Sequence, residues 1–148
     1  MRIVWTGDLG EGTSGYRAYG RRHEVTAPER PAIAGSSDPA FRGDPDRWDP
    51  ERLLVASLSQ CHMLGYLHQC ADAGVVVVAY EDHAVGTMVQ SADGGGRFTE
   101  VVLRPAVTVA DESMLEQARA LHERAHELCF IANSVNFAVR HEPSIAVA

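Results

Sequence analysis

The feature that most constrains the fold of this chain is one long helix-forming segment that begins at Asp49-Pro50-Glu51. An aspartate that can cap a helix, a proline suited to the first turn and an acid near the positive end of the helix dipole together mark a helix start. The helix is predicted to run to about Ala73, just before Gly74. Over residues 53–67 apolar or small side chains occur on nearly every side, which is typical of a helix enclosed by other elements. We therefore expect a central helix.

The segments on either side of this helix predict short strands and one further helix. Strands and helices do not alternate regularly, so the expected class is α+β with antiparallel sheets. Pro105 should lie at a sheet edge or a bulge. The expected elements, in chain order, are a hairpin of strands 2–6 and 16–25 around the Gly-rich turn 7–15, an irregular connection 26–49 with a short edge strand near 32–34, the central helix, a longer hairpin of 75–90 and 97–109, a helix over 112–129 capped by Asp111, and a final strand near 137–147.

Length and charge restrict the classes of function. A chain of 148 residues fits one domain, spanning 1–148, near the size at which pairing with a second copy helps stability. The 13 basic and 20 acidic residues give a net charge of −7, which opposes binding to nucleic acid or to anionic membranes. The first ten residues lack an apolar signal stretch and no run is long enough to span a bilayer, so we expect a cytoplasmic protein.

Three cysteines stand out as candidate chemical groups. Their odd number and wide spacing do not suit a secreted disulfide framework, so they are better interpreted as thiols. The alternative is that all three are buried packing residues, as free cysteines often are. Cys70 lies nine residues after Cys61, on the opposite face of the helix, and is expected to be such a packing residue. Cys61 and Cys129 could meet if their two helices pack together.

The two remaining thiols differ in their expected electrostatics. Cys61 lies about three turns into its helix, too deep for the helix dipole to help its thiolate much, so an arginine must supply the stabilising charge. Cys129, at the end of the second helix, lies in a field that disfavours a thiolate. This asymmetry assigns nucleophilic attack to Cys61 and resolution of an oxidised partner to Cys129.

Several motifs then resemble one protein family over nearly the whole chain. They are residues 49–64 (DPERLLVASLSQCHML), 73–75 (AGV), 80–86 (YEDHAVG), 103–105 (LRP) and 125–135 (AHELCFIANSV). In this order and spacing they resemble the OsmC/Ohr family of thiol-dependent peroxidases, and fit best with an OsmC-like branch. The resemblance implies two antiparallel sheets around a long central helix and a second cysteine-bearing helix, in an intertwined homodimer with the active site at the subunit interface.

The resemblance also implies roles for individual residues and requires no cofactor. Cys61 matches the peroxidatic cysteine, Cys129 the resolving cysteine and Glu51 the acid of the family's Pro-Glu motif. Residues 19–23 (YGRRH) resemble a Tyr-x-Arg-x-His element, which points to Arg21 as the arginine that stabilises the thiolate. Its neighbour Arg22 would face the other way on a strand, so only one of the two should serve.

The implied reaction is the reduction of an organic hydroperoxide to an alcohol. Arg21 would stabilise the Cys61 thiolate and Glu51 would orient that arginine. Cys61 would become a sulfenic acid, Cys129 would condense with it to a disulfide, and an external dithiol would restore both thiols. The chain departs from the Ohr branch at Phe130, where that branch has a proline, so the preference for organic hydroperoxides is a hypothesis.

Other interpretations of these residues stay open at the level of sequence. Glu51 alone suits the first turn of any helix, and Arg21 alone suits a solvated strand. His62, His122, His126 and Cys129 could form a metal site, and His126 could exchange a proton with Cys129. A third possibility is a small-ligand or stress-related binding module on the same fold, with inert cysteines.

Overall fold

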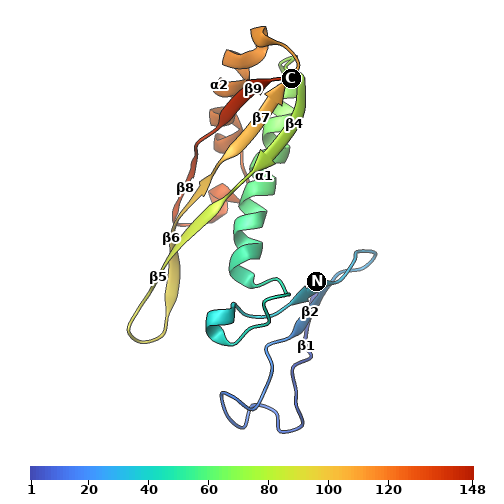
Figure 1. Ribbon diagram of the computed structural model, residues 1–148, viewed down its shortest axis with the longest axis vertical. Coiled ribbons are helices and arrows are strands. Elements are labelled where there is room, and N and C mark those ends of the chain that lie inside the picture. The colour runs from blue at the N-terminus through green and yellow to red at the C-terminus, as the bar shows by residue number, and fades with distance from the viewer. The chain divides into compact units, whose positions relative to one another are not determined.

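The computed structural model describes all 148 residues, which form two compact units, Met1–Leu54 and Val55–Ala148 (Figure 1). The α+β class predicted from sequence is confirmed. Organisation as one domain stays a prediction, because each unit is compact by itself.

The first unit contains one small antiparallel sheet. Its strands are β1 (Arg2–Trp5), β2 (His23–Thr26) and β3 (Ile33–Gly35), in the order β1-β2-β3, followed by the short 3-10 helix η1 (Pro39–Phe41). The predicted edge strand near 32–34 is confirmed as β3. The predicted strand over 16–25 is wrong for residues 16–22, which form a loop.

The physical reason for this shorter strand is a close contact between two glycines. The Gly20 N–H donates to the Gly7 carbonyl at 2.7 Å, and a Cβ on Gly7 would lie only 2.0 Å from the Gly20 carbonyl oxygen. The Trp5 indole Nε1–H also donates to the Gly20 carbonyl, at 2.8 Å. Side chains of ordinary strand residues would not fit here, so this part of the hairpin is a tight glycine-lined loop.

The long helix predicted from sequence is confirmed as α1 (Pro50–Asp72). At its start, Asp49 Oδ1 accepts a hydrogen bond from the Arg52 N–H at 2.7 Å, which caps the first turn. At its end, Gly74 adopts a left-handed conformation with φ of 74°, and the Val75 N–H donates to the Cys70 carbonyl at 2.9 Å. This is the Schellman arrangement, in which a glycine without Cβ turns the chain out of the helix.

The second unit contains two three-stranded sheets, and each strand of one sheet is followed or preceded along the chain by a strand of the other. The strands are β4 (Val77–Asp82), β5 (Val85–Gln90), β6 (Gly96–Leu103), β7 (Pro105–Val109), β8 (Ala138–His141) and β9 (Ser144–Val147). The orders are β4-β7-β9 and β5-β6-β8, so β4 leads into β5, β6 into β7 and β8 into β9 (Figure 1).

Two of the strand pairs correct the expectation of purely antiparallel sheets. β6 and β8 are parallel, and so are β7 and β9. The reason is that a helix, α2, connects β7 to β8, and a helical crossover returns the chain to the same end of the sheet. The final strand is also divided into β8 and β9. Pro105 was predicted at a sheet edge or a bulge, but it is the first residue of the central strand β7. Proline is tolerated at the first position of a strand.

The second helix is shorter than predicted. Asp111 caps the 3-10 turn that leads into it, because Asp111 Oδ1 accepts a hydrogen bond from the Ser113 N–H at 2.9 Å. A 3-10 turn, η2 (Glu112–Met114), precedes α2 (Leu115–Glu127), and a further turn, η3 (Ala132–Ser134), follows. Cys129 therefore lies two residues beyond the helix and not within it.

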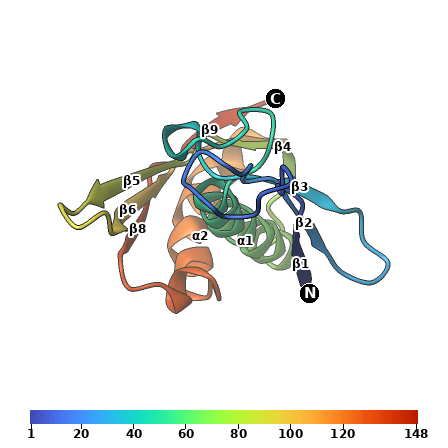
Figure 2. The same ribbon diagram turned by 90° about the horizontal axis from the view of Figure 1, so that it is seen from below.

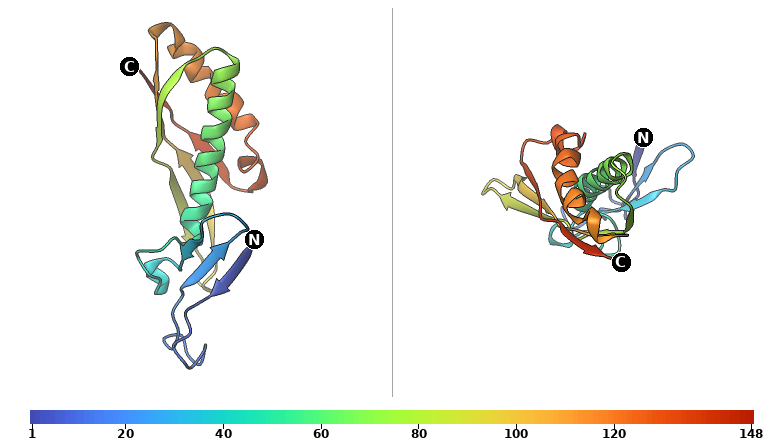
Figure 3. Two further views of the ribbon diagram at one scale, coloured as in Figure 1. Left: turned by 90° about the vertical axis from the view of Figure 1, so that its right-hand side faces the viewer. Right: turned by 90° about the horizontal axis from the view of Figure 1, so that it is seen from above.

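Within the second unit, α2 and the part of α1 from Val55 onward lie side by side on the same side of the strands (Figures 2 and 3). One core cluster joins Tyr66 and Cys70 of α1 with Val107 of β7 and Ala118 of α2. A second cluster joins Leu58 of α1 to β6. The packing places the fourth and fifth turns of α1 beside the end of α2. No helix of the chain is long and apolar enough to cross a membrane.

Candidate functional site

Cys61 and Cys129 meet at one cavity in the second unit. Cys61 projects from the fourth turn of α1, and Cys129 lies in the turn after α2, where their side chains interact. The cavity measures about 380 Å³. It is lined by Cys61, Gly65, His68, Gln69, Ala125, Leu128, Cys129 and Phe130. The structure thus brings together the two thiols that the sequence predicted as a pair.

The surroundings of Cys129 favour its neutral thiol. Burial, with only 4% of the residue exposed, is the main cause that raises its pKa, and the neighbouring Cys61 raises it further. The Ala132 N–H points at Cys129 Sγ at 3.5 Å and partly opposes this shift of the pKa. The sequence predicted a field that disfavours the Cys129 thiolate, and the raised pKa has that direction. Its largest cause is burial and not the field at the helix end.

The turn that carries Cys129 is held by its own backbone. The Cys129 N–H donates to the His126 carbonyl at 3.2 Å, and the Asn133 N–H donates to the Cys129 carbonyl at 3.0 Å. The Asn133 side chain donates to the Glu127 carbonyl at 2.9 Å. These bonds satisfy the free carbonyls at the end of α2 and fix the thiol beside Cys61.

Cys70 lies apart from this cavity. It is 1% exposed within the core cluster, and burial raises the pKa of its thiol. It also interacts with Tyr66, one turn earlier on α1. Its burial agrees with the predicted packing role.

Arg21 and Arg22, both in the first unit, have different surroundings. Arg21 is half-buried, donates to the carbonyls of Tyr19 at 2.6 Å and Tyr16 at 2.7 Å, and lies over both tyrosine rings at 4.2 and 4.4 Å from their centroids. Arg22 instead pairs with Asp44 at 2.8 Å. Both arginines precede β2, so the alternation of side chains along a strand does not apply to them. They differ in the partners that they bind.

Glu51 lies in the first turn of α1 and makes no ion pair within 4 Å in this chain. The predicted contact between Glu51 and Arg21 is therefore not formed here. The cysteines lie in the second unit, and the role of Arg21 and Glu51 toward them stays a prediction.

A group of stacked histidines lies behind the cysteines in the core. His62 Nε2 and His122 Nδ1 form a hydrogen bond at 3.0 Å, and their rings stack at a centroid distance of 5.3 Å. His141 stacks beside both. Burial, with a smaller contribution from the neighbouring histidines, lowers the pKa of His62 to about 4 and that of His122 to about 3. The rings are therefore neutral at pH 7.

The metal-site interpretation of these residues gains no support from the structure. His62 and His122 do come together, but no group of three or more histidine, cysteine or acidic side chains has an arrangement suited to a metal ion. The His126 ring lies at a centroid distance of 5.4 Å from His141, and no hydrogen bond joins His126 to the Cys129 thiol.

Several residues that line the thiol cavity were not predicted from the sequence. Gly65 and His68 follow Cys61 by four and seven positions and so lie on its face of α1, a spacing that could have identified them. Leu128 and Phe130 flank Cys129, and Phe130 is 82% exposed. Apolar side chains thus form much of the wall on the α2 side.

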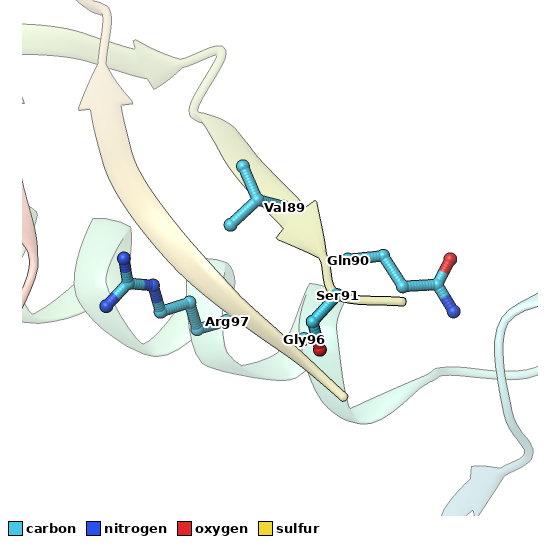
Figure 4. Close-up of a pocket in the computed structure, with 5 residues that line it drawn as sticks. All are labelled: Val89, Gln90, Ser91, Gly96 and Arg97. Atoms are coloured by element: carbon cyan, nitrogen blue, oxygen red, sulfur yellow. The ribbon is translucent and has the colours of Figure 1, made fainter. Parts of the chain in front are cut away.

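A second cavity, of about 370 Å³, lies on the hairpin of β5 and β6 (Figure 4). Its lining residues are Val89, Gln90, Ser91, Gly96 and Arg97. Figure 4 shows the Gln90 and Arg97 side chains pointing away from each other. Since no thiol or convergent pair of polar groups lies there, the cavity between the cysteines is the candidate site.

Comparisons with known proteins agree with this fold. Residues 43–144 match a family described as OsmC-like protein. The structure of an OsmC-like protein of unknown function from Vibrio cholerae O1 biovar eltor is 35% identical in sequence. That similarity covers 97% of this chain and 96% of that chain, with a TM-score of 0.85. A search of the curated proteins gave no match.

Two more distant structures share the fold. An organic hydroperoxide resistance protein from Elizabethkingia anophelis is 20% identical, with a TM-score of 0.67, over 86% of this chain and 90% of that chain. The organic hydroperoxide resistance protein OhrB of Bacillus subtilis is 20% identical, with a TM-score of 0.62, over 84% of this chain and 92% of that chain.

Proposed function

Because this chain belongs to the OsmC-like protein family and brings two thiols into one cavity, we propose that it is a thiol-dependent peroxidase that reduces organic hydroperoxides to alcohols. The observation that carries the proposal is the contact between Cys61 and Cys129, since a sulfur that is oxidised at one residue can be resolved at the other. The two organic hydroperoxide resistance proteins with the same fold support the choice of substrate class.

The proposed reaction divides between the two thiols. The Cys61 thiolate attacks the distal oxygen of the hydroperoxide, the O–O bond breaks as an S–O bond forms, and the alkoxide takes a proton from solvent and leaves as the alcohol. The resulting sulfenic acid is attacked by Cys129, which forms a disulfide and releases water. An external dithiol then reduces the disulfide by exchange and is itself oxidised. The pKa of Cys129, raised by burial, suits a thiol that stays protonated until Cys61 is oxidised.

Arg21 and Glu51 complete the proposed site. Arg21 would stabilise the Cys61 thiolate, and Glu51 would orient the guanidinium. In the isolated chain the Arg21 guanidinium is bound by the carbonyls of Tyr16 and Tyr19, so this role requires it to exchange those partners. An Arg21→Lys variant tests the role, because lysine keeps the charge but loses the planar fork. Unchanged turnover in Arg21→Ala would exclude the arginine.

The proposal includes a homodimer in the cytoplasm that needs a dithiol reductant and no metal or cofactor. Residues 1–148 would act as one domain with the site at the subunit interface. Three unpaired cysteines suit a reducing compartment, and the net charge of −7 is unfavourable for nucleic acid or anionic membranes. Light scattering of the purified protein tests the dimer, which a monomeric mass would exclude.

The decisive experiment measures peroxide consumption with cumene hydroperoxide and dithiothreitol. Wild type should turn over, and its thiol count should fall from three to one per chain when the reductant is withheld. Cys61→Ser should reduce turnover to the uncatalysed rate, because the attacking sulfur is lost. Cys70→Ala is the matched control, since Cys70 lies outside the cavity.

Two results would contradict the peroxidase proposal. A wild-type protein with no turnover by any dithiol and with unreactive thiols would indicate a binding module on the same fold. Turnover that survives in Cys61→Ser would move the attack to another group.

A further inference from the structure

Gly65 lies in the interior of α1, where glycine is destabilising relative to alanine because it loses more backbone freedom on folding. Its backbone does not require glycine, since its φ is not positive. A Cβ built on Gly65 would meet only the Ala125 carbonyl oxygen, at 3.9 Å, which is an ordinary contact. The helix therefore contains a destabilising residue that neither conformation nor packing demands.

Gly86 shows what a packing glycine looks like in the same unit. A Cβ there would lie 2.6 Å from a Phe98 ring carbon and 2.9 Å from a Val55 methyl carbon, so a larger residue could not fit. Gly65 has no such neighbour. Within this chain, what the absent side chain at Gly65 leaves is open space.

That space belongs to the thiol cavity. Gly65 follows Cys61 by one helical turn and lines the cavity together with Cys61, Cys129 and Ala125. Leu128 and Phe130 form the apolar part of the same wall. A side chain at position 65 would enter the cavity next to the sulfur of Cys61, because residues four apart on a helix lie above one another on one face.

We propose that Gly65 determines the size of the group that can approach Cys61. The proposal rests on the peroxidase function above and extends it to substrate selection: the apolar group of a bulky hydroperoxide lies over Gly65 while its O–O bond reaches the Cys61 sulfur. Residues larger than glycine at this position exclude bulky hydroperoxides and still admit small ones. Gly65 affects substrate selection only because it has no side chain to fill the cavity, and it takes no part in the chemical step.

Two readouts test this role, and the first of them does not depend on catalysis. In the first, Cys61 is alkylated under native conditions by iodoacetamide, which is small, or by N-(1-pyrenyl)maleimide, which is bulky, and modification is followed by peptide mass spectrometry. In the second, turnover is compared for cumene hydroperoxide and hydrogen peroxide. The variants are Gly65→Ala, Gly65→Leu and, as the matched control on the exposed part of α1, Ala71→Leu.

We expect Gly65→Leu to lower the ratio of bulky to small alkylation at Cys61 by roughly tenfold or more, the usual effect of a misfit in an apolar pocket. The ratio of cumene hydroperoxide to hydrogen peroxide turnover should fall similarly. Gly65→Ala should shift both ratios in the same direction and raise the melting temperature by about 2–4 °C, because alanine favours the helix. Ala71→Leu should leave both ratios unchanged.

Unchanged ratios in folded Gly65→Leu and Gly65→Ala would overturn the role of Gly65. A change of oligomeric state in Gly65→Ala, measured by light scattering, would also overturn it, because the glycine would then serve contact between copies. If Gly65→Leu fails to fold, the alanine variant decides by itself. Lack of turnover by wild type would instead contradict the peroxidase proposal, and the alkylation ratio does not depend on that outcome.

Discussion

At the scale of single residues, the two cysteines of the cavity have different surroundings. Cys61 is only partly buried on α1, whereas Cys129 is buried in a turn that is held by backbone hydrogen bonds. Burial raises the pKa of the Cys129 thiol. An accessible thiol beside a buried protonated one is the arrangement that attack followed by resolution requires.

This difference predicts the behaviour of Cys129→Ser. The variant should still reduce one equivalent of cumene hydroperoxide, because Cys61 is intact, but the sulfenic acid at Cys61 should persist, since no second thiol is near to condense with it. Oxidation should then consume one thiol per chain instead of two. Trapping with dimedone and mass spectrometry of the Cys61 peptide gives the measurement. Equal dimedone labelling of wild type and variant would refute resolution by Cys129.

At the scale of elements, α1 is defined by its two ends. Asp49 is 1% exposed, caps the first turn through the Arg52 N–H, and also forms an ion pair with the Arg52 guanidinium. Gly74 turns the chain out of the helix in a conformation that other residues rarely adopt. The turns between these ends carry Cys61 and Gly65.

The N-cap gives a prediction about stability. Asp49→Ala should lower the free energy of unfolding by about 1–2 kcal/mol, because the Arg52 N–H loses its acceptor. Asp49→Asn should lose less, since the amide oxygen can still cap the helix. Urea unfolding of the two variants and wild type measures the difference. Equal losses in the two variants would show that the charge of Asp49, and not its cap, stabilises the helix.

At the scale of the whole molecule, the second unit depends on groups that stay neutral inside its core. His62 of α1 and His122 of α2 form a buried hydrogen bond, and His141 of β8 stacks on both. The second ring nitrogens of His62 and His122 have no hydrogen-bond partner. Protonation would place unpaired charge in the core, so this contact between the helices holds only while the rings are neutral.

This cluster predicts a loss of stability in acid. An unfolded histidine binds its proton near pH 6.5, whereas the pKa of folded His62 is lowered to about 4. Between these pH values the unfolded state holds more protons, so stability falls as the pH falls. At pH 5 the loss from His62 alone should be about 2 kcal/mol relative to pH 7.5.

Urea unfolding at pH 7.5 and 5.0 measures this loss. In His62→Gln the difference between the two pH values should be smaller by about 2 kcal/mol than in wild type, because glutamine does not titrate. His68→Gln, a change at an exposed histidine of the same helix, should behave as wild type. The same acid loss in His62→Gln and wild type would show that carboxylates alone cause it.

The sequence by itself determined the features that depend on neighbours a few positions away. The helix from Pro50, its cap at Asp49 and its end before Gly74 were all predictable, because a cap or a left-handed glycine acts within one or two turns. The opposite faces of Cys61 and Cys70 also follow from helical spacing alone. The choice of Cys61 and Cys129 as a pair needed the family resemblance as well, and the structure then placed both in one cavity.

Only the tertiary structure decided the features that depend on residues far apart in the chain. The parallel pairs β6/β8 and β7/β9 arise from the path of α2 across the sheets. The hydrogen bond between His62 and His122 joins residues 60 positions apart. No local pattern specifies such contacts, because they form only when packing brings two elements together. The empty space beside Gly65 has the same origin: the sequence shows a glycine, and only the packing of α1 against the end of α2 shows that its missing side chain leaves the thiol cavity open.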